Sequence, residues 1–119
     1  MRSMLIIEGS KIVAGLCSEI FESRGWSVAI CVDCDEALEQ LVRGEPYDAI
    51  LLSYRVRGTD GLQLIKWIRA LEHLRVTAVA MITGSAGVGE EARSAGADEV
   101  LLKPIDSNSL LLAVEKHSS

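Results

Sequence analysis

Short apolar runs alternate with segments of helical periodicity along the whole chain, and this alternation restricts the possible folds more than any other feature. The apolar runs are expected to be strands, and they cover residues 4–7, 28–31, 49–52, 76–83 and 99–102. Strands that lack polar–apolar alternation are buried on both faces, which is typical of a parallel sheet between two helix layers. Because crossovers between parallel strands are right-handed, we predict a three-layer, doubly wound α/β fold with a five-stranded parallel sheet.

The segments between these runs contain residues that start, bury and end helices. In the first segment one buried helical face is expected, made of Ile12, Val13, Leu16, Cys17, Ile20 and Phe21. Gly25 is expected to end this helix. Asp33, Asp60 and Asp106 each precede a helical pattern and are expected to be N-caps, because aspartate accepts hydrogen bonds from the free amides there. Residues 53–60 are expected to form a polar loop.

The size and charge of the chain exclude several classes of protein. Its 119 residues suit a single domain over 1–119, and its net charge is −5. The 12 Lys and Arg residues are scattered, so direct binding of nucleic acid is not expected. The apolar runs are too short to span a bilayer and no secretion signal is recognised, so a cytoplasmic location without membrane contact is expected. The three cysteines are therefore expected to be free thiols.

The residues at the carboxyl ends of the expected strands are Glu8, Cys31, Ser53, Thr83 and Lys103. All but Cys31 are polar: a carboxylate, two hydroxyls and a lysine. In a doubly wound sheet, sites form beyond the carboxyl ends of the strands, so these side chains are expected to converge on one pocket. Burying polar groups is costly unless they pair with one another, which makes this set more informative than surface polarity.

Six short segments resemble the receiver domains of bacterial response regulators. They cover residues 5–8, 48–53, 58–61, 81–84, 95–99 and 102–104. They occur in the order and at the spacing of that family across residues 4–117, which is nearly the whole chain. The resemblance implies a (βα)5 flavodoxin-like receiver fold with strand order 2-1-3-4-5, and a cytoplasmic two-component signalling context.

The resemblance also implies a phosphorylation pocket. A working receiver pairs two acidic residues after its first strand with an aspartate that ends its third, and together they hold Mg²⁺ and present a nucleophile. Thr83 matches the family's hydroxyl residue, and Gly84 matches the small residue that leaves room for a phosphoryl group. Lys103 matches the family's lysine, and Pro104 follows it as a candidate cis peptide.

Several positions depart from the family pattern. Only Glu8 is acidic after the first strand, because Gly9 stands where the second acid belongs. Ser53 occupies the phosphoacceptor position, and Val100 replaces the family's aromatic switch residue. Arg57 replaces a common proline. The acceptor, a metal ligand and the switch are altered together, which is typical of a degenerate receiver.

These departures predict weak or absent Mg²⁺ binding and no other cofactor. Mg²⁺ usually needs more than one carboxylate or a phosphate, and Glu8 alone is a poor site. We expect Glu8 and Lys103 to pair directly or through water, with Ser53 and Thr83 completing the network. A serine hydroxyl is a weak nucleophile without a base, and neither His73 nor His117 lies at a strand end.

The sequence therefore favours a non-enzymatic, atypical receiver that signals through protein contacts without aspartate phosphorylation. By resemblance, its partner is a histidine kinase, an output domain or a second copy in a homodimer. The contact surface is expected to be the fourth helix, fifth strand and fifth helix, over about residues 90–116. One alternative is a phosphorelay protein that accepts phosphate on Ser53. A second is a redox protein that uses Cys31 and Cys34, because this C-x-x-C spacing lies at an expected helix start.

Overall fold

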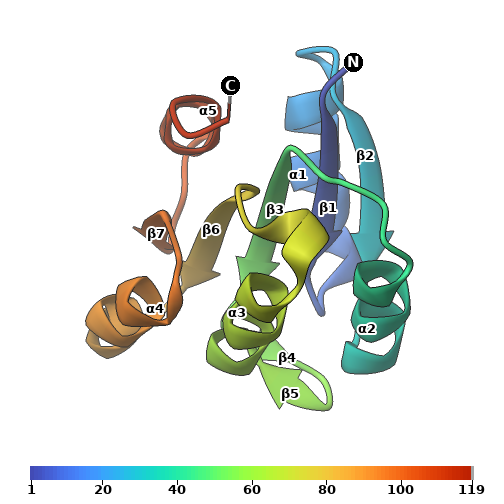
Figure 1. Cartoon of the computed structure of the whole chain (residues 1–119). Coiled ribbons are helices and arrows are strands. Elements are labelled where there is room, and N and C mark those ends of the chain that lie inside the picture. The colour runs from blue at the N-terminus through green and yellow to red at the C-terminus, as the bar shows by residue number, and fades with distance from the viewer. Residues whose placement is uncertain (119) are drawn as a thin grey trace.

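The computed structural model describes residues 1–118 (Figure 1). The strands of the main sheet are β1 (Ser3–Ile7), β2 (Ser27–Cys31), β3 (Ala49–Ser53), β6 (Ala78–Thr83) and β7 (Glu99–Leu102). A small hairpin consists of β4 (Arg55–Val56) and β5 (Thr59–Asp60). The α-helices are α1 (Lys11–Glu22), α2 (Cys34–Val42), α3 (Gly61–Ala70), α4 (Gly89–Ala95) and α5 (Ser107–Glu115). Two 3-10 turns are η1 (Glu72–Leu74) and η2 (Ala86–Val88).

The main sheet is parallel, and its strand order is β2-β1-β3-β6-β7. Because β4 and β5 form a separate antiparallel pair, this order corresponds to 2-1-3-4-5 among the main strands. The predicted fold class and strand order are therefore confirmed. The order reverses between β1 and β3, and in such sheets ligands bind beyond the carboxyl ends of the strands near that reversal.

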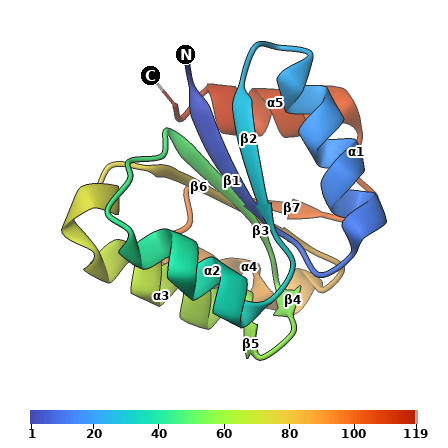
Figure 2. The same ribbon diagram turned by 90° about the vertical axis from the view of Figure 1, so that its right-hand side faces the viewer.

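Helices cover both faces of the sheet (Figure 2). Helices α1 and α5 lie on one face, and α2, α3 and α4 lie on the other. Successive residues of β1 alternate between the two faces, so Met4 and Ile6 join the α1–α5 core while Leu5 and Ile7 join the other core. Both layers of side chains are apolar, which explains why the strand sequences show no polar–apolar alternation.

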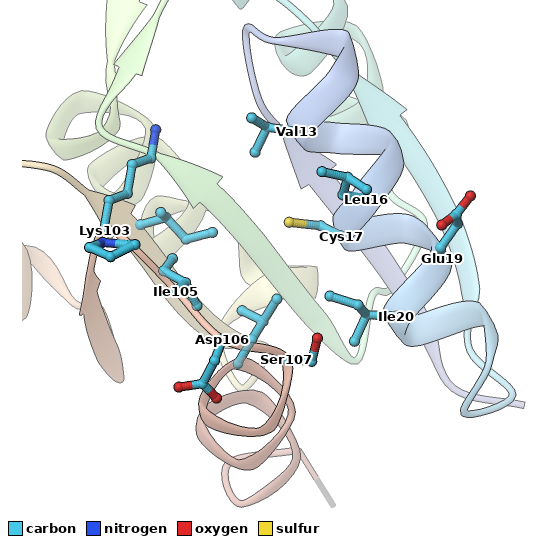
Figure 3. A pocket seen from close by; sticks show the side chains of 12 residues that line it. Val13, Leu16, Cys17, Glu19, Ile20, Lys103, Ile105, Asp106 and Ser107 are labelled. Carbon is cyan, nitrogen blue, oxygen red and sulfur yellow. The ribbon is translucent and has the colours of Figure 1, made fainter.

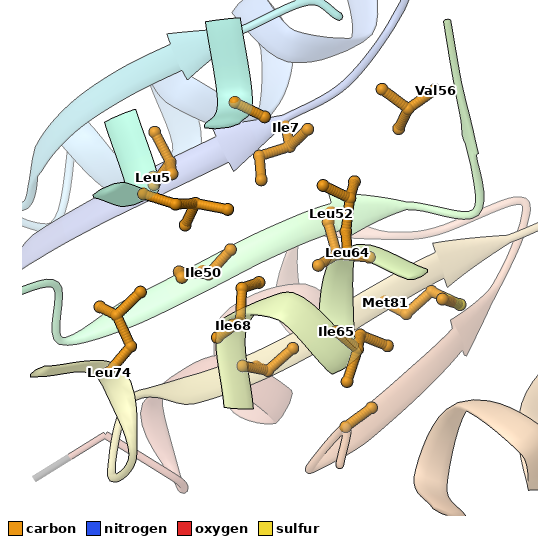
Figure 4. Close-up of a cluster of buried hydrophobic side chains, with 14 of the residues drawn as sticks. Leu5, Ile7, Ile50, Leu52, Val56, Leu64, Ile65, Ile68, Leu74 and Met81 are labelled. Atoms are coloured by element: carbon orange, nitrogen blue, oxygen red, sulfur yellow. The ribbon is translucent and has the colours of Figure 1, made fainter. Parts of the chain in front are cut away.

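The core under α3 consists of fully buried apolar side chains from the helix and the central strands (Figure 4). Leu64, Ile65 and Ile68 are 0% exposed and pack on Ile50 and Leu52 of β3. Burial of one such side chain contributes about 1.5–3 kcal/mol. The helical stripe predicted for this segment is therefore a main source of stability.

The predicted buried face of α1 is partly wrong. Cys17 and Phe21 are buried as expected, but Ile12 is 78% and Leu16 is 58% exposed. Ala14 and Ser18 are buried in their place. The apolar residues of α1 cover a wider arc than the sheet can contact, and the helix turns its smaller side chains toward the sheet. An apolar stripe of α1 is left beside α5.

Two further boundaries differ from the predictions. β6 begins at Ala78, and Val76 is 96% exposed in the preceding turn. The expected loop over residues 53–60 contains the β4–β5 hairpin, with Gly58 at its turn and Val56 buried. A pair of two-residue strands is too short to produce a recognisable strand pattern in the sequence.

The three aspartate caps are confirmed. The Asp33 carboxylate accepts a hydrogen bond from the amide of Glu36, at the start of α2. Asp60 and Asp106 accept hydrogen bonds from the amides three residues later, at the starts of α3 and α5. Each cap satisfies an amide that has no partner within its helix.

No helix among residues 1–118 combines the length and the apolar character needed to cross a bilayer.

Glu115 connects α5 to the start of the sheet. Its carboxylate accepts hydrogen bonds from Arg24 at 3.0 Å, Arg2 at 3.1 Å and the indole of Trp26 at 3.3 Å. The Arg24 hydrogen bond, followed by the Trp26 bond and the charges of both arginines, lowers the pKa of Glu115 from its ordinary value. A carboxyl with a lowered pKa stabilises the fold above its ordinary pKa and loses that effect as the pH falls through the folded-state pKa.

We therefore expect Glu115→Gln to lower the free energy of unfolding by about 1 kcal/mol near neutral pH. The difference from wild type should shrink on acidification, since wild-type Glu115 is then protonated too. Urea unfolding followed by tryptophan fluorescence at several pH values measures this. Glu39→Gln is the matched control, because the Glu39–Arg43 pair is exposed. A difference that stays constant across the acid range would contradict the assignment.

Candidate functional site

A cavity of about 320 Å³ lies beyond the carboxyl ends of the central strands. It is lined by Glu8, Ser53, Tyr54, Arg55, Ile82, Thr83, Gly84, Ser85 and Lys103. The polar strand-end residues predicted to converge therefore share one cavity, except Cys31, whose side chain lies in the core under α2 and α3. Parallel strands end at the same edge, which is why residues far apart in sequence meet here.

Glu8 and Ser53 form the centre of this cavity. Both are buried, at 7% and 4% exposure, and the Ser53 hydroxyl donates a hydrogen bond to Oε1 of Glu8. The other carboxylate oxygen, Oε2, accepts a hydrogen bond from the amide of Ser10 at 2.9 Å. Both oxygens of Glu8 are therefore occupied by neutral donors of the chain.

The expected network of Glu8, Lys103, Ser53 and Thr83 is only partly present. Within residues 1–118 no ion pair joins Glu8 to Lys103, whose side chain is exposed. Thr83 instead accepts a hydrogen bond from the amide of Ser85 at 3.0 Å. The direct Glu8–Lys103 pair is therefore absent, and the Glu8 carboxylate instead accepts hydrogen bonds from Ser53 and from the Ser10 amide.

The cavity is consequently rich in donors. Lys103 and Arg55 have no carboxylate within 4 Å among the described residues. The Thr83 hydroxyl acts as an acceptor toward Ser85, so its own proton remains free to donate. These three groups could together bind an anionic group.

The remaining predicted site residues surround the cavity. Gly9 is exposed and does not line it, although a Cβ at Gly9 would lie 3.8 Å from the carbonyl oxygen of Arg55. The Lys103–Pro104 peptide is cis. Val100 pairs with Met81 across β7 and β6, is partly buried and packs on the core under α3. A β-branched side chain held in this way has few alternative rotamers.

The residues that line the cavity do not fit the ligand requirements of a divalent ion. Glu8 is the one carboxylate among residues 1–118 that lines the cavity, and both of its oxygens are already hydrogen-bonded. Across that same part of the chain, no three His, Cys, Asp or Glu side chains gather as metal ligands would. Mg²⁺ in proteins usually binds through carboxylates together with substrate phosphates, and this cavity contains one engaged carboxylate.

The cysteines of the C-x-x-C pair have environments that oppose a thiolate. Cys31 is buried, and burial, followed by the nearby carboxylates of Glu36 and Asp33, raises the pKa of its thiol to about 11. The pKa of Cys34 is also raised, by burial and then by Asp35 and Asp33. Both thiols are free in the structure. Reactive thiols have lowered pKa values, so this pair lacks the electrostatics of a redox motif.

The expected partner surface on α4, β7 and α5 is organised around Glu99. Its carboxylate lies 2.8 Å from Lys116, 3.0 Å from His117 and 3.7 Å from Arg93. Hydrogen bonds from Lys116 and then His117 lower the pKa of Glu99 from its ordinary value. Glu99 of β7 is therefore ion-paired with residues from α4 and from the end of α5.

Sequence reasoning missed three contributors to the cavity. Ser10 supplies a backbone amide to Glu8, Ser85 supplies one to Thr83, and Arg55 supplies a cationic side chain. Backbone donors leave no signal in side-chain patterns. Arg55 is one of the scattered basic residues of the sequence, which were not expected to form a site.

The Glu8–Ser53 bond predicts a measurable effect on stability. Ser53→Ala removes the donor and leaves a buried carboxylate oxygen unpaired, so the free energy of unfolding should fall by about 1–2 kcal/mol. Ser85→Ala is the matched control, because Ser85 is exposed in the same cavity. Urea unfolding followed by circular dichroism compares the two. Equal stability of Ser53→Ala and wild type would show that this hydrogen bond contributes nothing.

A family model described as the response regulator receiver domain matches residues 4–115. The transcriptional regulatory protein DltR of Streptococcus agalactiae is 26% identical over 113 residues, which are 93% of this chain and 49% of DltR. The chain spans half or less of the length of the curated relatives it matches.

Solved structures of response regulators and receiver domains are also similar to this chain. A putative response regulator from Chloroflexus aurantiacus aligns with a TM-score of 0.90 and 25% identity, covering 98% of this chain and 96% of its own. The receiver domain of sensor histidine kinase PA1611 from Pseudomonas aeruginosa, with a magnesium ion coordinated in its active-site cleft, aligns with a TM-score of 0.86 and 26% identity. The PA1611 alignment covers 97% of this chain and 95% of the PA1611 chain.

Proposed function

The chain belongs to the response regulator receiver domain family, and from this premise we propose that it is an atypical receiver that signals without aspartate phosphorylation. The observation that carries the proposal is the state of Glu8. It is the one carboxylate of the cavity within residues 1–118, and Ser53 and the Ser10 amide hold both of its oxygens. The residue at the acceptor position thus serves as a donor to Glu8.

The output of such a domain is protein contact. The proposed partner is a histidine kinase, an output domain or a second copy of the chain, bound through the surface formed by α4, β7 and α5. The Glu99 cluster holds the three elements of this surface together by ion pairs, which supports a preformed contact. Val100 packs on the core and has few alternative rotamers, which supports the proposal that this surface keeps one conformation.

Incubation with acetyl phosphate and Mg²⁺, followed by intact mass spectrometry, tests the proposal. We expect no phosphoryl adduct and no change of the melting temperature on addition of millimolar Mg²⁺. A hydroxylamine-labile adduct, which is characteristic of an acyl phosphate, would contradict it.

One observation favours a second candidate function, in which Ser53 itself accepts phosphate. The Ser53 hydroxyl donates to Glu8, so a carboxylate base is in place, although the sequence suggested none. Transfer would form the Ser53 Oγ–phosphorus bond, break the phosphorus–oxygen bond of acetyl phosphate, move the Ser53 proton to Glu8 and release acetate. A hydroxylamine-resistant adduct that is absent in Ser53→Ala would establish this function.

A further inference from the structure

A second, larger cavity lies between α1 and α5, with a volume of about 720 Å³ (Figure 3). Val13, Leu16 and Ile20 of α1 form one wall. Ile105 and Leu110 contribute from the segment that leads into α5 and from α5 itself. Cavities that enclose small ligands measure about 300–1,000 Å³ and are mostly apolar, so this groove has the size and lining of a ligand site.

The groove is lined by side chains that would normally be covered. Leu16 is 58% exposed, although it lies on the apolar stripe of α1 that the sequence predicts to be buried. Ile82 of β6 also lines the groove and is only 3% exposed, so it belongs to the deeper part of the lining. Contiguous exposed apolar surface on a small domain marks a binding surface more often than chance.

The two ends of the groove differ in charge. Lys103 extends toward the end where Val13 lies, and Asp106 and Ser107 lie at the other end (Figure 3). Lys103 and Ile82 line both this groove and the cavity that contains Ser53 and Glu8. The apolar groove therefore adjoins the donor-rich cavity at Lys103.

The charge of Lys103 is unmatched within the described part of the chain. Seven of the 12 Lys and Arg residues form ion pairs, whereas Lys103 and Arg55 have no carboxylate within 4 Å among residues 1–118. Thr83, in the same cavity as both, has a free hydroxyl proton. Lys103 is the one cation among the described residues that line the groove, whose two carboxylates belong to Glu19 and Asp106. An anionic group at Lys103 would therefore pair with a cation that has no carboxylate partner within the described residues.

We propose that this groove binds a small amphipathic anion. Its apolar body lies between α1 and α5, and its single carboxylate or phosphate head binds Lys103 at the junction of the two cavities. The carboxylate of Asp106 at the far end disfavours a molecule with a second anionic end. This inference goes beyond the proposed function, because it requires neither phosphoryl transfer nor a protein partner.

Titration of the ¹⁵N-labelled protein with decanoate and with decyl phosphate, below their micelle concentrations, tests the proposal by NMR. We expect saturable shift changes at Val13, Leu16 and Lys103 for at least one anion, and the stronger binder identifies the head group. Decan-1-ol, which lacks the charge, should bind about tenfold more weakly than the better anion. Decanedioate, which has a carboxylate at each end, should also bind more weakly than decanoate.

Three variants locate the binding. Lys103→Met should weaken binding of the anions about tenfold and leave decan-1-ol unchanged, because it keeps the apolar stem and removes the charge. Leu16→Glu puts a carboxylate in the groove wall and should abolish anion binding. Leu112→Glu is the matched control, since Leu112 is 69% exposed and does not line the groove.

The proposal is overturned if neither anion gives saturable shifts in the groove, or if Leu112→Glu weakens binding as much as Leu16→Glu. Binding of decan-1-ol as tight as that of the anions would also overturn it. Sedimentation analysis completes the test, because a dimer that Leu16→Glu dissociates would assign the groove to a second copy of the chain.

Discussion

A chain with Gly9→Asp and Ser53→Asp together is expected to bind Mg²⁺ and to form an acyl phosphate with acetyl phosphate, and we expect the wild-type chain to do neither. The double change places three carboxylates around one cavity, the number that receivers use to hold Mg²⁺ and attack phosphorus. Thr83 and Lys103, which match the family's phosphoryl-binding residues, already line that cavity.

The structure has room for a side chain at position 9 and places position 53 beside Glu8. A Cβ at Gly9 would meet only the carbonyl oxygens of Arg55 at 3.8 Å and Val32 at 3.9 Å, which are ordinary contact distances. Ser53 already contacts the Glu8 carboxylate, so an aspartate at this position lies within reach of the same ion. Without Mg²⁺ the crowded carboxylates repel, and the double variant should be less stable than wild type.

Thermal unfolding and intact mass spectrometry measure these effects. At a Mg²⁺ concentration ten times its dissociation constant, the double variant should gain about 1.4 kcal/mol in stability and wild type nothing. Only the double variant should form a hydroxylamine-labile adduct with acetyl phosphate. The single variants are the controls and should bind Mg²⁺ more weakly. A double variant that folds but gains no stability from Mg²⁺ would show that the residues at positions 9 and 53 do not by themselves decide whether the cavity binds Mg²⁺.

Gly61→Ala is expected to destabilise the fold by about 3 kcal/mol or more, a large effect for the addition of a single methyl group. Gly61 begins α3 directly behind the carboxyl end of β3. A Cβ there would lie 2.6 Å from Met81 Cε, 2.7 Å from the carbonyl oxygen of Ser53 and 2.9 Å from Tyr54 Cα. The methionine can move, but two of these contacts are backbone atoms that the sheet holds in place.

Gly15→Ala is the matched control for this substitution. Gly15 lies within α1, and a Cβ there would meet nothing within 4 Å. Alanine is favoured over glycine inside a helix, so this variant should gain about 0.5–1 kcal/mol. Urea unfolding of both variants gives the comparison. A loss below about 1 kcal/mol for Gly61→Ala would mean that α3 can move away from β3 more easily than the close contacts indicate.

The sequence predicts most of the fold because the relevant signals are local and repeated. Each signal depends on the conformation of the nearby backbone. This holds for the apolar runs, the capping aspartates and the stripe of Leu64, Ile65 and Ile68. The errors occur where a tertiary contact decides burial. Ile12 and Leu16 match a helical stripe, yet they are exposed because α1 turns Ala14 and Ser18 toward the sheet.

For the candidate site, residue identity and position along the chain are enough to predict which polar residues end the strands and which of them depart from the family. The partners of these residues follow from the tertiary structure alone. Ser53 and a backbone amide satisfy Glu8, and the charge of Lys103 is left without a partner within residues 1–118. Pairing depends on distances of a few ångströms between separate strands and loops, and no local pattern in the chain encodes those distances.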